Sequence, residues 1–231
     1  MSEQMNLPLH EAILLLALKD REGTIIPMTE YLYAIGGAIL AELVLSERLD
    51  LEGDKGGEVV AVRSSNLTGN AQLDECLQDI VSEQTPETAA TWIKRFAGIR
   101  NLKNRMAESL VEKGILRSSE KKILRIFKRK VFPELNAGPE RRCIAQLRRT
   151  VFSGEPVQDP RTIILLSLIK NTNLMQSVFT DDELRVHFQR IERVINTEIT
   201  GETQEAITAV KAAFQVTHII PGLLASSSSR S

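Results

Sequence analysis

The side chains that most often carry catalysis are scattered along this sequence of 231 residues. The three histidines, His10, His187 and His218, lie far apart, and none has a cysteine or carboxylate at metal-ligand spacing. The acidic run Asp181–Glu183 follows Thr180, which is the pattern of a helix capping box rather than of a metal site. The sequence therefore predicts a protein that is not an enzyme and that needs no metal or cofactor.

Motifs for phosphate and nucleotide chemistry are also absent from the sequence. There is no GxSxG, no GxxxxGK[ST], and no strand followed by GxGxxG. The stretch Gly53–Gly57 is rich in glycine, but Asp54 within it would repel a phosphate. A hairpin turn is the better interpretation of this stretch.

Cations are concentrated in one part of the chain. The formal net charge is only -1, yet residues 94–149 carry 17 basic and 5 acidic side chains, a net charge of +12. Residues 1–93 carry a net charge of -11 and residues 150–231 one of -2. Such a patch points to a polyanionic partner, whether nucleic acid, an anionic membrane or an acidic protein. The alternative is a solvated basic face balanced by the acidic N-terminal third.

Two basic elements are predicted within this part. A helix over Ile99–Lys113 would place Arg100 and Lys103 on one face, three positions apart. After a turn at Ser118–Lys121, the run KKILRIFKRK would form a basic strand and hairpin with apolar side chains among its cations. Its candidate contact residues are Lys121, Lys122, Arg125, Phe127, Lys128, Arg129 and Lys130. Such a hairpin suits an anionic bilayer surface, although a DNA-binding wing would use the same cations.

Hydrophobic periodicity predicts a mainly α protein. We expect one compact helical domain over residues 7–225, with about nine helices and one or two surface β-hairpins, between an N-terminal tail (1–6) and a disordered Ser-rich tail (226–231). The predicted helices are Leu9–Lys19, Met28–Glu47, Ala71–Glu83, Pro86–Phe96, Ile99–Lys113, Pro139–Phe152, Arg161–Phe179, Asp181–Asn196 and Thr203–Ile219. Gly36 and Gly37, inside the second helix, indicate close packing or a ligand near the backbone.

The remaining features predict a cytoplasmic protein. The longest apolar runs, Ala12–Leu18 and Tyr31–Ala41, are shorter than the 18–20 or so residues that a transmembrane helix needs. No basic segment precedes the first run, as a secretory signal would require. Cys76 and Cys143 are too few and too distant for a disulfide framework.

Several stretches together resemble the Golgi phosphoprotein 3 family. They are LLLALKDREG (14–23), AELVLSERLDLE (41–52), LDECLQDI (73–80), ETAATWIKRF (87–96), LVEKGIL (110–116), DPRTIILLSLIKNTNLMQSVF (159–179) and AVKAAF (209–214). Members of the family are peripheral membrane proteins that bind phosphatidylinositol 4-phosphate. The resemblance implies a helical fold with a protruding hairpin, matching about Glu120–Val131 here, that contacts membranes and supports homo-oligomers.

The resemblance also implies a basic lipid-headgroup pocket built from a Trp and three Arg. Arg100 matches one Arg, and Lys103 stands where a second is expected. The Trp position falls near Met28 and the third Arg position at Gly36, so two of the four groups are missing. We therefore expect a peripheral membrane protein that binds anionic headgroups, phosphatidylinositol 4-phosphate among them, with weak selectivity.

The alternative function is a nucleic-acid-binding, winged-helix-like module that uses the same basic segment. A Golgi location is expected only if the source organism has a Golgi. Because residues 1–8 carry no Arg or Lys, a coat-adaptor role is not expected, and no client protein is assigned.

Overall fold

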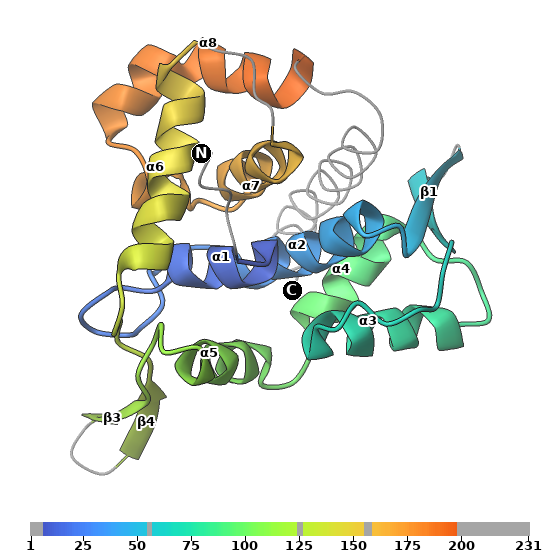
Figure 1. Ribbon diagram of the computed structural model, residues 1–231, viewed down its shortest axis with the longest axis horizontal. Coiled ribbons are helices and arrows are strands. Elements are labelled where there is room, and N and C mark those ends of the chain that lie inside the picture. Colours follow the sequence, from blue (N-terminus) through green and yellow to red (C-terminus); the bar gives the residue numbers. More distant parts are fainter. Residues whose placement is uncertain (1–6, 55–56, 124–126, 155–158, 198–231) are drawn as a thin grey trace, which may run out of the picture.

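The computed structural model describes residues 7–54, 57–123, 127–154 and 159–197, and Figure 1 shows their arrangement. The helices of these residues are α1 (Leu9–Ala17), α2 (Tyr31–Leu45), α3 (Ala71–Ser82), α4 (Ala89–Ala97), α5 (Leu102–Glu112), α6 (Gly138–Phe152), α7 (Pro160–Asn171) and α8 (Asp181–Thr197), with a short 3-10 turn at Met175–Ser177. The strands are β1 (Leu49–Asp54), β2 (Gly57–Val62), β3 (Ser119–Ile123) and β4 (Phe127–Val131). The predicted helix Thr203–Ile219 and both predicted tails lie outside the described residues.

Helices α1 and α2 form the centre of the fold. Every residue of α1 is buried, and α2 is buried from Ala34 to Val44. Helix α2 packs against α1, α4 and α7, which accounts for its apolar residues on all sides. The predicted mainly α fold with two small hairpins is confirmed.

No helix among the described residues combines the length and the apolar character that crossing a membrane requires.

A close helix crossing explains one of the glycines in α2. An ideal Cβ at Gly36 would lie 2.6 Å from the backbone oxygen of Ile93 in α4. The close packing that the Gly36-Gly37 pair predicted is thus confirmed at Gly36.

We expect Gly36→Ala to lower the free energy of unfolding by about 1–3 kcal/mol, because the added methyl would force the two helices apart. Gly98→Ala is a matched control, since a Cβ there would lie 3.4 Å from its nearest neighbour, an ordinary contact. Urea unfolding of both variants measures the effect. Equal stability of the two variants would show that the α2–α4 crossing has room to adjust.

Several helices begin where capping residues indicate. Asn70 accepts hydrogen bonds from the backbone N–H groups of Gln72 and Leu73 at the start of α3. Thr180 and Glu183 form the predicted capping box at the start of α8, since each side chain accepts from the other's backbone N–H.

Other helix boundaries differ from the prediction because single residues adopt left-handed backbone. Met28 (φ 61°) precedes α2, which begins at Tyr31, so Met28 is not helical. Asn101 (φ 60°) precedes α5, so Arg100 lies in the turn before the helix, and its predicted helical face shared with Lys103 is wrong. Asn173 (φ 57°) follows α7, which ends well short of the predicted Phe179. Helix α4 begins after its cap Thr88, not at the predicted Pro86.

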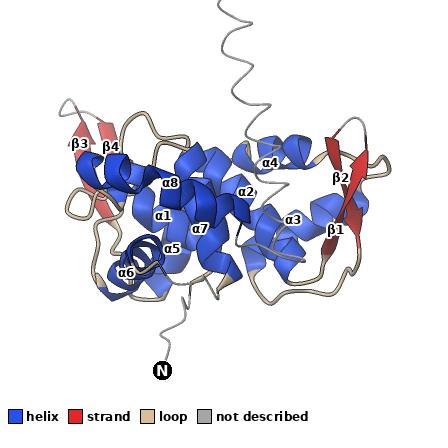
Figure 2. Cartoon of the chain, turned by 90° about the horizontal axis from the view of Figure 1, so that it is seen from above, coloured by secondary structure: helices blue, strands red, loops and turns tan. Residues whose placement is uncertain are grey.

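The two hairpins lie at opposite ends of the molecule's long axis (Figures 1 and 2). The β1–β2 hairpin is as predicted. The second hairpin runs from Ser119, paired with Val131, to Ile123, paired with Phe127. The turn predicted at Ser118–Lys121 is therefore wrong, because Ser119–Lys121 lies within β3. The ladder instead continues toward the protein body through a bridge between Leu116 and Glu134.

Candidate basic membrane-binding site

The base of the β3–β4 hairpin is fixed to the loop that follows α1. Beyond β4, the backbone N–H of Phe132 donates to the oxygen of Gly23 over 3.0 Å, and that of Glu134 donates to Asp20 over 2.9 Å. Gly23 has φ 61°, and a Cβ there would lie 2.2 Å from the Phe132 backbone. Only glycine therefore permits this approach. The KDREG stretch holds the hairpin in place.

Two lysines lie over the buried ring of Phe132. The Nζ atoms of Lys103 (α5) and Lys130 (β4) lie 5.6 Å and 5.7 Å from its centroid. Lys130 also forms an ion pair with Glu108, whereas Lys103 has no carboxylate partner among the described residues. The aromatic ring therefore positions the Lys103 ammonium at the junction of helix and hairpin.

Arg129 lies close to both Lys103 and Tyr31. Partial burial lowers the pKa of Lys103, and the positive charge of Arg129 lowers it further. Burial raises the pKa of Tyr31, which the guanidinium of Arg129 partly opposes. The phenol therefore keeps its proton at neutral pH and is available as a hydrogen-bond donor. The described residues provide no ion-pair partner for Arg129 either, so its charge acts on both Lys103 and Tyr31 without being neutralised by a carboxylate among them.

Met28 is presented to solvent at the adjacent turn. It is 92% exposed, and it adopts left-handed backbone that costs a side-chain-bearing residue about 1–2 kcal/mol. The turn is held by two hydrogen bonds, from the hydroxyl of Thr29 to Ile26 and from the backbone N–H of Glu30 to Thr172. An exposed apolar side chain on a fixed, strained turn is a feature of binding sites rather than of cores.

The hairpin carries further cations on both faces. The backbones of Lys121 and Arg129 are directly opposite, so these two exposed side chains share one face. The backbone of Lys122 is opposite Lys128, which pairs with Glu120. The side chains of Lys122 and Phe127, and all of Arg125, lie outside what the structure describes.

Two of the predicted headgroup residues stand apart from this cluster. Arg100 is exposed in the turn before α5, and the described residues give it no ion pair. Gly36 is buried against α4 and exposes no surface to a ligand. The structure thus brings together Lys103, Arg129 and Lys130, but not Gly36.

Tyr31 and Phe132 belong to the site, although the sequence did not indicate them. Both lie next to predicted site residues along the chain, Phe132 after the basic run and Tyr31 three residues after Met28. Their contribution arises only through contacts between segments distant in sequence, for which periodicity gives no signal.

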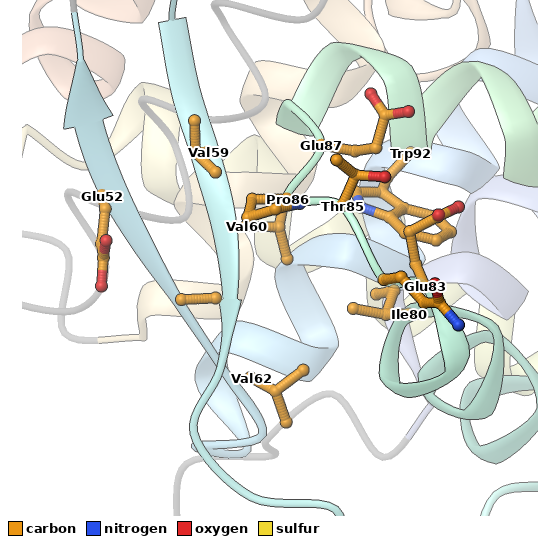
Figure 3. A pocket seen from close by; sticks show the side chains of 12 residues that line it. Glu52, Val59, Val60, Val62, Ile80, Glu83, Thr85, Pro86, Glu87 and Trp92 are labelled. Atoms are coloured by element: carbon orange, nitrogen blue, oxygen red, sulfur yellow. The ribbon is translucent and has the colours of Figure 1, made fainter.

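The opposite end of the molecule has a pocket of about 220 Å³ between β2 and the α3–α4 connection (Figure 3). Val60, Ile80 and Trp92 form its apolar lining. Its carboxylates Glu83 and Glu87 both pair with Arg95, which lowers the pKa of Glu83. No unpaired cation lines this pocket, so its charge is unsuited to a phosphate.

Three carboxylates gather behind the hairpin base. Ligand atoms of Asp20, Glu134 and Glu140 lie within 4.8 Å of one another. Burial and these neighbouring charges raise the pKa of Glu140 to about 8. Because the residues come from three separate segments, their spacing along the chain does not predict this cluster. A proton held by Glu140 accounts for the close approach of these carboxylates, and no other feature of the described residues indicates a cation there.

Fold and candidate site together define a class of protein: a mainly helical core with a basic hairpin, at whose base two lysines lie over a buried aromatic ring. The chain belongs to the Golgi phosphoprotein 3 (GPP34) family, whose family model matches residues 9–214. The predicted family membership is therefore confirmed.

One relative is the vacuolar protein sorting-associated protein 74 of Eremothecium gossypii. It is 28% identical over 183 residues, which are 71% of this chain and 53% of that protein. The chain thus spans about half the length of this curated relative. The low identity agrees with a distant position within the family.

Proposed function

We propose that the chain is a non-enzymatic, peripheral membrane-binding protein that holds anionic lipid headgroups between Lys103, Arg129 and Tyr31. The observation that carries this proposal is that the Nζ atoms of Lys103 and Lys130 both lie within 6 Å of the Phe132 ring centroid, while Lys103 and Arg129 have no ion-pair partner among the described residues. Partial burial and mutual repulsion disfavour this arrangement while it is empty. A bound phosphate would offset the cost of burying the cations and their mutual repulsion. It would also accept a hydrogen bond from the Tyr31 phenol.

The surrounding surface supports binding to a bilayer rather than to a free anion. By sequence, the hairpin adds the cations Lys121, Lys122, Arg125, Lys128 and Lys130 and the apolar Phe127, and the exposed Arg100 adds a cation before α5. Exposed Met28 supplies a side chain that gains from entering the interfacial region of a membrane. Gly36 is the predicted site residue that has no place in this proposal.

The charge distribution gives the molecule an orientation on an anionic membrane. Residues 100–130, which include the β3–β4 end, carry a net charge of +8. Residues 47–93, which include the β1–β2 end, carry one of -7. Because these ends are opposite (Figure 2), the basic end would face the bilayer and the acidic end would point away.

Family membership supports the location and partners that we propose. These are the cytoplasmic face of a membrane, the Golgi where the organism has one, phosphatidylinositol 4-phosphate among the anionic lipids, and self-association through the hairpin. Selectivity for this lipid is expected to be below about ten-fold at equal vesicle charge. Lys103 lacks the bidentate fork of Arg, and no cation can extend from Gly36.

Liposome flotation tests the proposal. Binding to phosphatidylserine vesicles should fall steeply as salt rises to about 0.5 M, where the Debye length is below about 5 Å. Vesicles of equal charge that contain phosphatidylinositol 4-phosphate should bind within ten-fold of the same affinity. A DNA gel-shift at matched salt is the comparison. Binding to DNA but not to vesicles would favour the nucleic-acid alternative, and salt-independent binding to neutral vesicles would exclude an electrostatic headgroup site.

A further inference from the structure

A second pocket lies beside the Met28 turn. Its volume is about 460 Å³, within the range of small-molecule sites. Ile26, Pro27, Met28 and Leu174 form its apolar side, and Asn173 and Gln176 add neutral amides. None of the described residues that line this pocket is charged. It therefore suits an uncharged group that has both apolar and hydrogen-bonding parts.

The pocket is formed by two turns held against each other. The backbone N–H of Glu30 donates to Thr172 over 3.1 Å, and the amide of Asn173 reaches the backbone oxygen of Met28 at 3.5 Å. Met28 and Asn173 both adopt left-handed backbone, one on each side. A main-chain hydrogen bond and the Asn173 amide thus hold the two sides of the pocket together.

The position of the pocket indicates its ligand. Ile26 and Met28 line it, and three residues before Ile26 the backbone oxygen of Gly23 accepts a hydrogen bond of 3.0 Å from Phe132, over whose ring Lys103 and Lys130 lie. A cationic region and a neutral, partly apolar region are therefore neighbours. A phospholipid divides its chemistry in the same way, into an anionic headgroup and an uncharged glycerol ester with acyl chains.

We propose that this pocket binds the glycerol-ester region and first acyl methylenes of the phospholipid whose headgroup occupies the basic site, an inference that rests on the proposed function. The amides of Asn173 and Gln176 would donate to ester carbonyls. Ile26 and Leu174 would contact the first methylenes. Each methylene buried raises affinity about four-fold.

The test compares dihexanoyl-phosphatidylserine, below its micelle concentration, with glycerophosphoserine, the same headgroup without acyl chains. Calorimetry or NMR titration gives both affinities. We expect the wild-type protein to prefer the acylated ligand at least ten-fold. Gln176→Trp, which fills the pocket, should reduce this ratio below about three-fold and leave glycerophosphoserine binding unchanged. Gln78→Trp, at an exposed site on α3, is the matched control and should keep the ratio.

Asn173→Gly is a second variant that keeps the left-handed backbone and removes only the amide. It should also lower the ratio, so the proposal stays testable if Gln176→Trp does not fold. The pocket proposal would be wrong if the wild-type protein bound the two ligands equally, or if both variants kept the wild-type preference for the acylated ligand. Neither result would contradict the headgroup site. Failure of the protein to bind either ligand or anionic vesicles would overturn both.

Discussion

Reversing the charge of Lys121 and Arg129 together should abolish binding to anionic vesicles. These residues are cross-strand neighbours on one face of the hairpin, both are exposed, and the described residues give neither an ion pair. Each unit of charge near an anionic bilayer contributes about 1 kcal/mol. Replacing both with Glu changes four units, so we expect affinity to fall by about three orders of magnitude at low salt.

The control for this prediction carries the same change of net charge elsewhere. Arg142→Glu with Arg149→Glu reverses two exposed cations on α6, outside the proposed site. Flotation at low salt should show binding lost in the hairpin variant and reduced only modestly in the α6 variant. Thermal melts should show both folded, since surface substitutions usually change stability by less than about 0.5 kcal/mol each. Equal losses in both variants would mean that net charge, not the hairpin, drives binding.

The helices of this fold were predictable where polar caps and apolar stripes agree. The stripe Leu73, Cys76, Leu77 and Ile80 is buried along α3, and Thr180 with Glu183 starts α8. Both signals are local, because a helix repeats every 3.6 residues and its first N–H groups need acceptors nearby.

Prediction was least successful where one residue's backbone decides the structure. Met28, Asn101 and Asn173 adopt left-handed backbone at helix boundaries, and a Met there is uncommon enough that composition cannot reveal it. The second hairpin was misplaced for a related reason. Polar Ser118–Lys121 has the composition of a turn, but pairing with the segment through Glu134 makes it part of the ladder.

The candidate site was predictable in charge but not in geometry. The basic run and Lys103 are evident from the sequence, whereas the ring of Phe132 that orders two lysines depends on Gly23, over one hundred residues earlier. The resemblance predicts an Arg position at Gly36, but the crossing with α4 leaves no room for a side chain there, so Gly36 cannot supply a charge.

A buried histidine should give the protein an acid-sensitive stability. His10 in α1 is fully buried, and neither ring nitrogen has a hydrogen-bond partner among the residues that the structure describes. Burial, followed by the charges of Lys113 and Arg161, lowers its pKa to about 3. Below about pH 6.5, His10 is therefore protonated in the unfolded chain but stays neutral in the folded protein. As the pH is lowered from 6.5 to 3, the contribution of His10 to the free energy of unfolding falls by about 1.4 kcal/mol for each pH unit.

Glu140 should act in the opposite direction over part of this range, which makes the two effects separable. Its pKa is raised to about 8, so above its unfolded value of 4.5 the folded protein keeps a proton that the unfolded chain loses, and stability falls as pH rises. Between pH 4.5 and 6.5 the two groups nearly cancel in the wild-type protein. Urea unfolding at these two pH values should show His10→Leu losing stability as pH rises and Glu140→Gln gaining about 2.7 kcal/mol. A Glu140→Gln protein equally stable at both pH values would mean that His10 is protonated within the fold.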